Sequence, residues 1–132
     1  MATQVILLID DDPDDVFFTR HVLKRHGITH EIVVAIDGES ALELLLPDLT
    51  RAPLSPVVVL LDLNMPGIGG RETLRRLRAH KPTETLPVIA FTTTERDREL
   101  VTAAQPQLTV ALQKPLTFID FEKASAQLGL HW

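Results

Sequence analysis

Short apolar runs alternate along this chain with longer stretches that have a helical pattern. Five runs rich in Val, Ile and Leu predict strands, at residues 4–9, 31–36, 57–61, 87–91 and 109–113. Their apolar character is nearly continuous, which is typical of strands that helices cover on both faces of a sheet. Strands that alternate with helices indicate βαβ units. The pattern therefore predicts an α/β fold with a doubly wound, five-stranded parallel sheet.

Capping residues, proline and glycine mark the ends of the helices between these strands. Asp12 is predicted to cap the first helix, with Pro13 at its first position, Asp15 in its first turn and Gly27 placed to end it. The other helices are predicted at residues 40–46, around Leu74 and Leu77, from Glu95 onward behind Thr94 as cap, and at about 117–128. These elements fill the chain, so we expect a single domain over residues 1–132.

Polar residues appear where several of the predicted strands end. The acidic triplet 10–12 follows the first strand, and Asp62 follows the third. The threonines 92–94 follow the fourth strand, and Lys114 follows the fifth. The carboxyl ends of parallel strands meet at one edge of a sheet, where ligands of open α/β folds bind. We therefore expect these side chains to form one shared site.

The acidic members of this site favour a divalent cation. Asp10, Asp11 and Asp62 would repel one another unless a cation lay between them. Mg²⁺ prefers oxygen ligands in octahedral geometry, whereas zinc and copper favour the histidine and thiolate ligands that these strand ends lack. The predicted metal is therefore Mg²⁺.

The remaining polar residues suit phosphoryl transfer. A carboxylate such as Asp62 can attack a phosphoryl group and form an acyl phosphate. The incoming phosphoryl oxygens would need a cation and a hydrogen-bond donor, which Lys114 and Thr92 supply. Every role in phosphoryl transfer onto Asp62 therefore has a candidate residue.

The composition is that of an ordinary globular protein. Apolar residues make up 45% and charged residues 23% of the 132 residues, and cysteine is absent. No apolar run approaches the roughly 20 residues of a membrane helix, and the N-terminus lacks a signal-peptide pattern. We therefore expect a cytoplasmic protein without membrane contact. The net charge of −5 disfavours nucleic-acid binding.

One basic stretch departs from this acidic balance. It comprises Arg71, Arg75, Arg76, Arg78, His80 and Lys81. A solvated helix face explains such a stretch, and a docking surface for an acidic partner is the alternative.

Four segments carry a resemblance to a known family. They are residues 7–12 (Leu-Leu-Ile-Asp-Asp-Asp), 60–67 (Leu-Leu-Asp-Leu-Asn-Met-Pro-Gly), 91–93 (Phe-Thr-Thr) and 113–115 (Gln-Lys-Pro). Together they resemble the receiver domain of two-component response regulators, over essentially the whole chain. The resemblance implies a flavodoxin-like (βα)5 fold with strand order 2-1-3-4-5. It also implies a phosphoacceptor signalling domain, which catalyses only its own phosphorylation and dephosphorylation and is not otherwise an enzyme.

The resemblance assigns the metal and the acceptor. Asp62 would receive the phosphoryl group from a histidine of a partner kinase. Asp11 would ligate Mg²⁺ directly, Asp10 mainly through water, and Asn64 through its backbone carbonyl.

The same resemblance implies how the phosphoryl group is sensed. Thr92 would turn its hydroxyl toward the phosphoryl group, and Lys114 would form an ion pair with it. The Lys114–Pro115 peptide bond is expected to be cis. Many receivers carry an aromatic residue three positions before the lysine, where this chain has Ala111. We therefore predict that the signal leaves through other movements, of the loop 92–94 and of the fourth and fifth helices.

Further features resemble a subgroup of stand-alone receivers that pair with bacterial phytochromes. These are the acidic opening at 10–15, the proline-containing loop 47–56 and an apolar tail at about 129–132. No output domain follows residue 132, so we expect a stand-alone receiver. The tail either packs on its own domain or reaches a second subunit. In the subgroup a homodimer would use the last strands and helices with the tail, with Trp132 and Phe121 as contacts.

Three other interpretations fit the sequence less well. A haloacid-dehalogenase-type phosphatase needs a second carboxylate two residues after the nucleophile, where Asn64 stands. The glycines in 67–70 do not complete a dinucleotide-binding fingerprint, because its third glycine is replaced by Glu72. A receiver that binds partners without phosphorylation would not need the full set of site residues.

Overall fold

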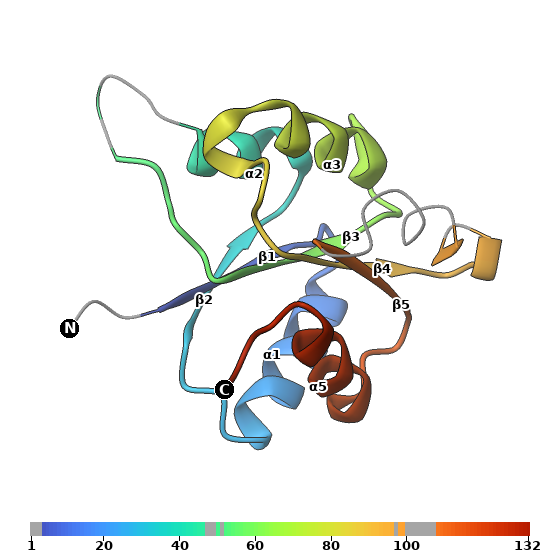
Figure 1. Cartoon of the computed structure of the whole chain (residues 1–132). Helices are drawn as coiled ribbons and strands as arrows, with labels where there is room; N and C mark the ends of the chain where they lie inside the picture. The colour runs from blue at the N-terminus through green and yellow to red at the C-terminus, as the bar shows by residue number, and fades with distance from the viewer. Residues whose placement is uncertain (1–3, 47–49, 51, 97, 100–107) are drawn as a thin grey trace.

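A five-stranded parallel sheet forms the centre of the molecule (Figure 1). The computed structural model describes residues 4–46, 50, 52–96, 98–99 and 108–132. The strands are β1 (Val5–Ile9), β2 (Glu31–Ala35), β3 (Val58–Asp62), β4 (Val88–Thr92) and β5 (Thr109–Gln113). Their order is β2-β1-β3-β4-β5 with parallel pairing throughout. The predicted fold class and strand order are confirmed.

Helices cover both faces of the sheet, as the continuous apolar strands predicted. They are α1 (Pro13–Arg25), α2 (Gly38–Leu45), α3 (Gly69–Ala79) and α5 (Phe118–Gln127), with a short 3-10 helix, η1 (Lys81–Thr83). In Figure 1, α2 and α3 lie on one face, and α1 and α5 lie on the other. The fourth predicted helix shows its first turn, because Arg98 donates its backbone N–H to the Thr94 carbonyl at 3.2 Å. Its continuation falls on residues 97 and 100–107, outside the described residues.

Two hydrophobic clusters lie on opposite faces of the sheet because successive strand residues point to opposite sides. Leu7 and Ile9 of β1 join the cluster that includes Ala41 of α2. Ile6 and Leu8 of the same strand join the cluster that includes Phe121 of α5. Fully burying one such side chain stabilises the fold by about 1.5–3 kcal/mol. Alternate residues of one strand therefore hold both layers of helices in place.

The predicted ends of α1 and α5 agree with the structure, whereas α2 begins at Gly38, before the predicted start, and ends at Leu45, before the predicted end. Asp12 caps α1, its Oδ1 accepting the Asp14 N–H at 2.9 Å. Gly27 follows the helix with φ of +86°, a left-handed conformation that glycine adopts without strain. Thr117 caps α5, its hydroxyl accepting the Asp120 N–H at 3.2 Å.

The basic stretch divides into two parts that differ in contacts. Arg75 and Arg76 form ion pairs with Glu72 on the surface of α3, at 2.6 and 2.8 Å. Arg78 instead turns inward, where its guanidinium donates to the Leu86 carbonyl at 2.6 Å and to the Thr109 hydroxyl at 2.9 Å. These contacts favour a solvated face with one structural arginine over a docking surface.

The C-terminal tail packs against its own domain. The Trp132 ring lies 5.2 Å from that of Phe121 and 4.8 Å from that of His30, measured between centroids. Phe121 is fully buried by apolar packing within its own chain. The prediction of Phe121 as a dimer contact is therefore wrong, because its side chain has no exposed surface for a second subunit. Trp132 stays partly exposed. Dimerisation through this region stays a prediction.

Among the described residues, none of the helices combines the length and the apolar character that crossing a membrane requires.

Candidate functional site

Three carboxylates meet at the carboxyl edge of the sheet, as the sequence predicted. One oxygen each of Asp10, Asp11 and Asp62 lies within 4.8 Å of the others. Asp10 and Asp11 follow β1, and Asp62 is the last residue of β3. These two strands are direct neighbours in the sheet, which brings together residues about fifty positions apart in the chain.

Backbone groups orient two of these carboxylates. Asp10 Oδ1 accepts the Asp12 N–H at 3.0 Å, and Asp62 Oδ1 accepts the Asn64 N–H at 2.9 Å. Both hydrogen bonds form turns in which an aspartate carboxylate accepts the backbone N–H two residues later. The strand ends thus fix the carboxylates in place before any ligand binds.

The acidic cluster is largely withdrawn from water. Asp10 and Asp62 are 4% and 2% exposed, whereas Asp11 is exposed. Burial raises the pKa of Asp10 to about 6, and the nearby Asp62 charge adds to the rise, against the hydrogen bond from Asp12. A cation bound here would offset the cost of burying the Asp10 charge and favour the ionised form of that carboxyl.

Lys114 reaches the cluster from the end of β5. Its Nζ donates to Asp62 Oδ2 at 3.0 Å and to Asp15 Oδ2 at 2.8 Å. Burial alone would lower the pKa of Lys114, but the hydrogen bonds to Asp15 and Asp62 outweigh it, so the pKa is raised and the ammonium stays charged. The Lys114–Pro115 bond is cis, as expected. The contact with Asp15 was missed, although Asp15 lies in the first turn of the helix that follows the acidic triplet.

The end of β4 supplies the hydroxyl side of the site. Thr92 is the last residue of β4 and is fully buried. Its hydroxyl accepts the Thr94 N–H at 3.2 Å and therefore bonds within its own loop. Thr93 Oγ1 accepts the Asn64 side-chain amide at 3.3 Å, which links this loop to the loop after β3.

The strand ends are one residue longer than predicted at Asp62 and Thr92. Both residues keep the backbone pairing of their strands, with Asp62 opposite Phe91 and Thr92 opposite Gln113. The ladder continues because Leu63 donates its N–H to the Phe91 carbonyl at 2.9 Å. Asp62 and Thr92 therefore lie on paired strands rather than on free loops.

Helix α3 begins directly against the backbone of Asp62 and Leu63. A Cβ atom on Gly70 would lie 2.4 Å from the Asp62 carbonyl oxygen and 2.4 Å from Leu63 Cα. Only glycine permits this approach without a shift of the backbone. Gly70 therefore permits the close approach of α3 to Asp62, a role that the sequence did not reveal.

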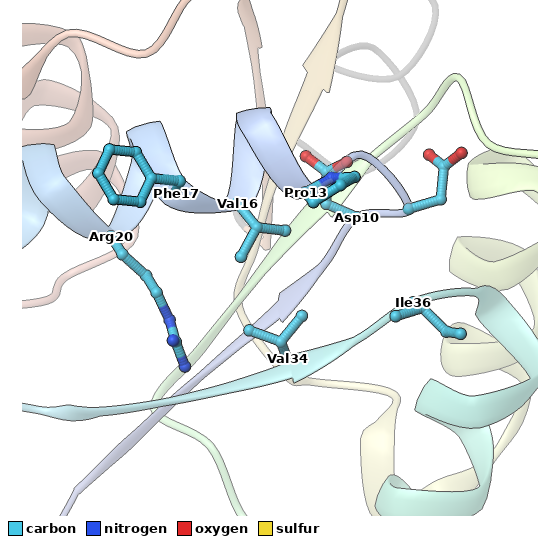
Figure 2. Close-up of a pocket in the computed structure, with 8 residues that line it drawn as sticks. Asp10, Pro13, Val16, Phe17, Arg20, Val34 and Ile36 are labelled. Atoms are coloured by element: carbon cyan, nitrogen blue, oxygen red, sulfur yellow. The ribbon is translucent and has the colours of Figure 1, made fainter.

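A groove leads from the acidic cluster along α1 to the edge strand β2 (Figure 2). Its volume is about 440 Å³. The lining residues labelled in Figure 2 are Asp10, Pro13, Val16, Phe17, Arg20, Val34 and Ile36. Phe17 and Ile36 are 73% and 65% exposed, so apolar surface lies open beside the acidic site. Arg20 donates to the Ile32 carbonyl of β2 at 3.0 Å.

A family model described as the response regulator receiver domain matches residues 6–125. The chain belongs to this family. Members of the family are phosphoacceptor signalling domains, and the fold and the acidic edge described above agree with that membership.

Two known proteins match nearly the whole chain. It is 28% identical over 131 residues to the response regulator Rcp1 of Synechocystis sp., which covers 98% of this chain and 88% of Rcp1. It is 29% identical over 128 residues to the probable methanogenesis regulatory protein FilR2 of Methanothrix harundinacea, covering 97% of this chain and 83% of FilR2.

Two solved structures of bacteriophytochrome response regulators share this fold closely. AtBRR superposes with a TM-score of 0.86 at 31% identity, covering 100% of this chain and 96% of AtBRR. RtBRR superposes with a TM-score of 0.86 at 31% identity, covering 99% of this chain and 81% of RtBRR. The receiver is therefore similar to phytochrome-associated regulators in sequence and in structure.

The aromatic position of this receiver is filled by a small core residue. Ala111 of β5 is 2% exposed and pairs in register with Ala90 of β4. It joins the hydrophobic cluster on the α2 and α3 face. No ring is present at this position to move between two orientations, so the prediction of another signalling route still stands as a prediction.

Proposed function

We propose that Asp62 accepts a phosphoryl group from a histidine of a partner kinase and that this switches the protein-interaction surface of the receiver. The observation that carries the proposal is the meeting of four charged groups at the ends of three strands, β1, β3 and β5. Asp10, Asp11 and Asp62 lie within 4.8 Å of one another, and the Lys114 ammonium lies 3.0 Å from Asp62. This arrangement combines a nucleophile, oxygen ligands for a cation and a fixed positive charge.

The transfer replaces a bond between phosphorus and nitrogen by a bond between phosphorus and oxygen. A carboxylate oxygen of Asp62 attacks the phosphorus, and the phosphorus–nitrogen bond of the phosphohistidine breaks. The imidazole nitrogen leaves with the bonding electron pair and takes up a proton. Lys114 lies at hydrogen-bonding distance from Asp62, so its ammonium can form an ion pair with the phosphoryl oxygens once they are bound there. In dephosphorylation, water attacks the phosphorus of the acyl phosphate. The bond between phosphorus and the Asp62 oxygen breaks, the carboxylate re-forms, and inorganic phosphate is released. Catalysis thus stays confined to the receiver's own acceptor.

Mg²⁺ fits the residues present. The cluster offers carboxylate oxygens alone, and their mutual separation of at most 4.8 Å suits one small ion. Asp11 and Asp62 would bind the ion directly, Asp10 would act mainly through water, and Asn64 would add its backbone carbonyl. When bound, Mg²⁺ neutralises charge that builds up on the phosphoryl oxygens.

Thr92 is proposed to report the phosphoryl group. Its hydroxyl now accepts the Thr94 N–H, and a phosphoryl oxygen would give it a more strongly charged partner. A hydroxyl that turns toward Asp62 would release Thr94 and shift the loop that begins the fourth helix. The phosphoryl group adds a charge of about −1.5 to −2, which biases this loop between two positions. Because Ala111 has no ring that could move, this loop is the proposed start of the signalling route.

The proposed partner is a histidine kinase, and the similarity to bacteriophytochrome response regulators points to a bacterial phytochrome. The groove of Figure 2 gives such a kinase a surface beside the acceptor. The exposed apolar side chains Phe17 and Ile36 of this groove suit an amphipathic helix of the kinase. Asp10 lies at the end of the groove and belongs to the same carboxylate cluster as Asp62.

Acetyl phosphate with Mg²⁺ tests the proposal without a kinase. The mass of the intact chain should rise by one phosphoryl group, and the gain should vanish in Asp62→Asn. Asp120→Asn, which changes an aspartate on α5 far from the cluster in sequence, is the matched control and should still take up the group. Uptake by neither the wild type nor the control would instead support a module that only binds partners. Steady hydrolysis of unrelated phosphomonoesters would support a phosphatase.

A further inference from the structure

Lys114 is shared between the acceptor and a second carboxylate on another element. Its Nζ lies 2.8 Å from Asp15 Oδ2 and 3.0 Å from Asp62 Oδ2. Asp15 is in the first turn of α1, and Lys114 follows β5, 99 positions later. The helix is held at that turn by its Asp12 cap and by Pro13. Asp15 therefore presents its charge from a fixed position.

Phosphorylation changes the balance between these two partners. A lysine ammonium has three N–H donors, and two of them bind carboxylates in this structure. Once Asp62 becomes an acyl phosphate, its own oxygens lose their carboxylate charge, whereas Asp15 keeps a full charge at 2.8 Å. The new negative charge of about −1.5 to −2 lies on the phosphoryl oxygens. Those oxygens must then compete with Asp15 for the same ammonium.

Space beside the lysine allows this exchange. A cavity of about 70 Å³ adjoins the pair, with Asp10, Asp15 and Lys114 in its wall. The Asp15 side chain is partly exposed, and that of Asp62 is buried. Water can therefore solvate Asp15 when the ammonium turns away, and the lysine can return to it when the phosphoryl group leaves.

We propose that Asp15 is a positioning residue that competes with the phosphoryl group on Asp62 for the Lys114 ammonium and thereby weakens the hold of the site on that group. This inference rests on the proposed function of Asp62. Asp15 acts as a counter-ion that keeps Lys114 beside the empty acceptor and opposes the phosphorylated state. Its effect is on the affinity of the site, with Lys114 as the group through which it acts.

The test is the affinity for beryllofluoride, a phosphoryl mimic, measured with Mg²⁺ by titration calorimetry on the whole chain. Asp15→Asn keeps the shape of the side chain and removes its charge. We expect it to bind about tenfold more tightly than the wild type, the size of one hydrogen bond to a charged group. Asp14→Asn removes the same charge from an exposed neighbour and should bind as the wild type does.

Asp15→Glu separates a charge contact from a packing role. The glutamate keeps the charge and changes the shape, so its affinity should stay within about twofold of the wild type if competition for Lys114 matters. A packing role would perturb the glutamate variant more than the asparagine variant and would overturn the inference. Equal or weaker binding by Asp15→Asn, or equal tightening by Asp14→Asn, would also overturn it. If the wild type does not bind beryllofluoride, the proposed function of Asp62 is refuted together with the inference. If the wild type binds it and Asp15→Asn does not bind it more tightly, the inference on Asp15 alone is refuted.

Discussion

The Lys114 ammonium donates to Asp62 Oδ2 at 3.0 Å and joins the end of β5 to the end of β3 across β4. The pair is unequal in exposure, because the Asp62 side chain is 3% exposed and that of Lys114 is 23% exposed. A buried carboxylate that loses its cation is left beside other acidic groups. The stability of the strand ends should therefore depend on this lysine.

Lys114→Gln should lower the free energy of unfolding in buffer with a chelator. Loss of one partner of a partly buried pair is expected to cost about 1–3 kcal/mol, less than for a fully buried pair. Urea unfolding followed by circular dichroism measures the loss, and Mg²⁺ should recover part of it by neutralising the same carboxylates. Lys123→Gln, at an exposed position of α5, is the control and should change stability by less than about 0.5 kcal/mol. An equal loss in both variants would contradict the role of the pair.

Mg²⁺ should stabilise the wild type against unfolding. An ion that binds the folded state alone stabilises it by about 2.7 kcal/mol at 100 times its Kd. Asp11→Asn removes an exposed member of the cluster, and the rise in Tm with Mg²⁺ should shrink strongly in this variant. Asp14→Asn should keep the full rise. A wild-type Tm that does not change when Mg²⁺ is added would argue against a metal site at this edge of the sheet.

Thr92→Ala should separate phosphorylation from switching. The variant should still take up a phosphoryl group, because Asp62 and its neighbours are unchanged. It should lose most of the change in amide chemical shifts that phosphorylation causes in and after the loop 92–94, and unfold about 1 kcal/mol more easily through loss of the hydrogen bond with Thr94. Thr93→Ala, on the neighbouring exposed residue, is the comparison. Full chemical-shift changes in Thr92→Ala would refute its part in the switch.

Phe17→Ser should weaken transfer from the kinase without affecting the acceptor. Phe17 is 73% exposed in the groove, and aromatic side chains often dominate the binding energy of an interface. We expect phosphotransfer from a bacterial phytochrome kinase to fall about tenfold, with uptake from acetyl phosphate unchanged. Ile119→Ser, an equally open apolar position on α5, should retain normal transfer. The reverse result would place the kinase on the α5 side.

Arg78→Lys should destabilise the end of the sheet opposite the site. The guanidinium of Arg78 binds carbonyls of Leu86 and Leu108 and the hydroxyl of Thr109, which one ammonium cannot cover with the same geometry. The expected cost is about 2–4 kcal/mol in urea unfolding, since buried carbonyls would lose their donors. Arg76→Lys, on the surface of the same helix, should cost less than about 0.5 kcal/mol. Equal costs would show that Arg78 contributes no more than a surface arginine.

The apolar pattern and the local chemistry of the sequence are sufficient to predict the sheet, several helix ends and most of the candidate site. Five apolar runs fall within one residue of the observed strands, because burial on both faces leaves a continuous apolar signal. Asp10, Asp62 and Lys114 could be grouped in advance, since the carboxyl ends of parallel strands share one edge. Local chemistry also placed the caps, as at Asp12.

Contacts that depend on how distant elements cross are visible only in the folded structure. Asp15 looked like a helix-start residue, and only the packing of α1 beside the end of β5 places it 2.8 Å from Lys114. Arg78 looked like one of several surface arginines until α3 met the start of β5. Phe121 proved to be a core residue of its own chain. Periodicity reports which face of an element is buried, but it carries no information on which distant side chain lies opposite.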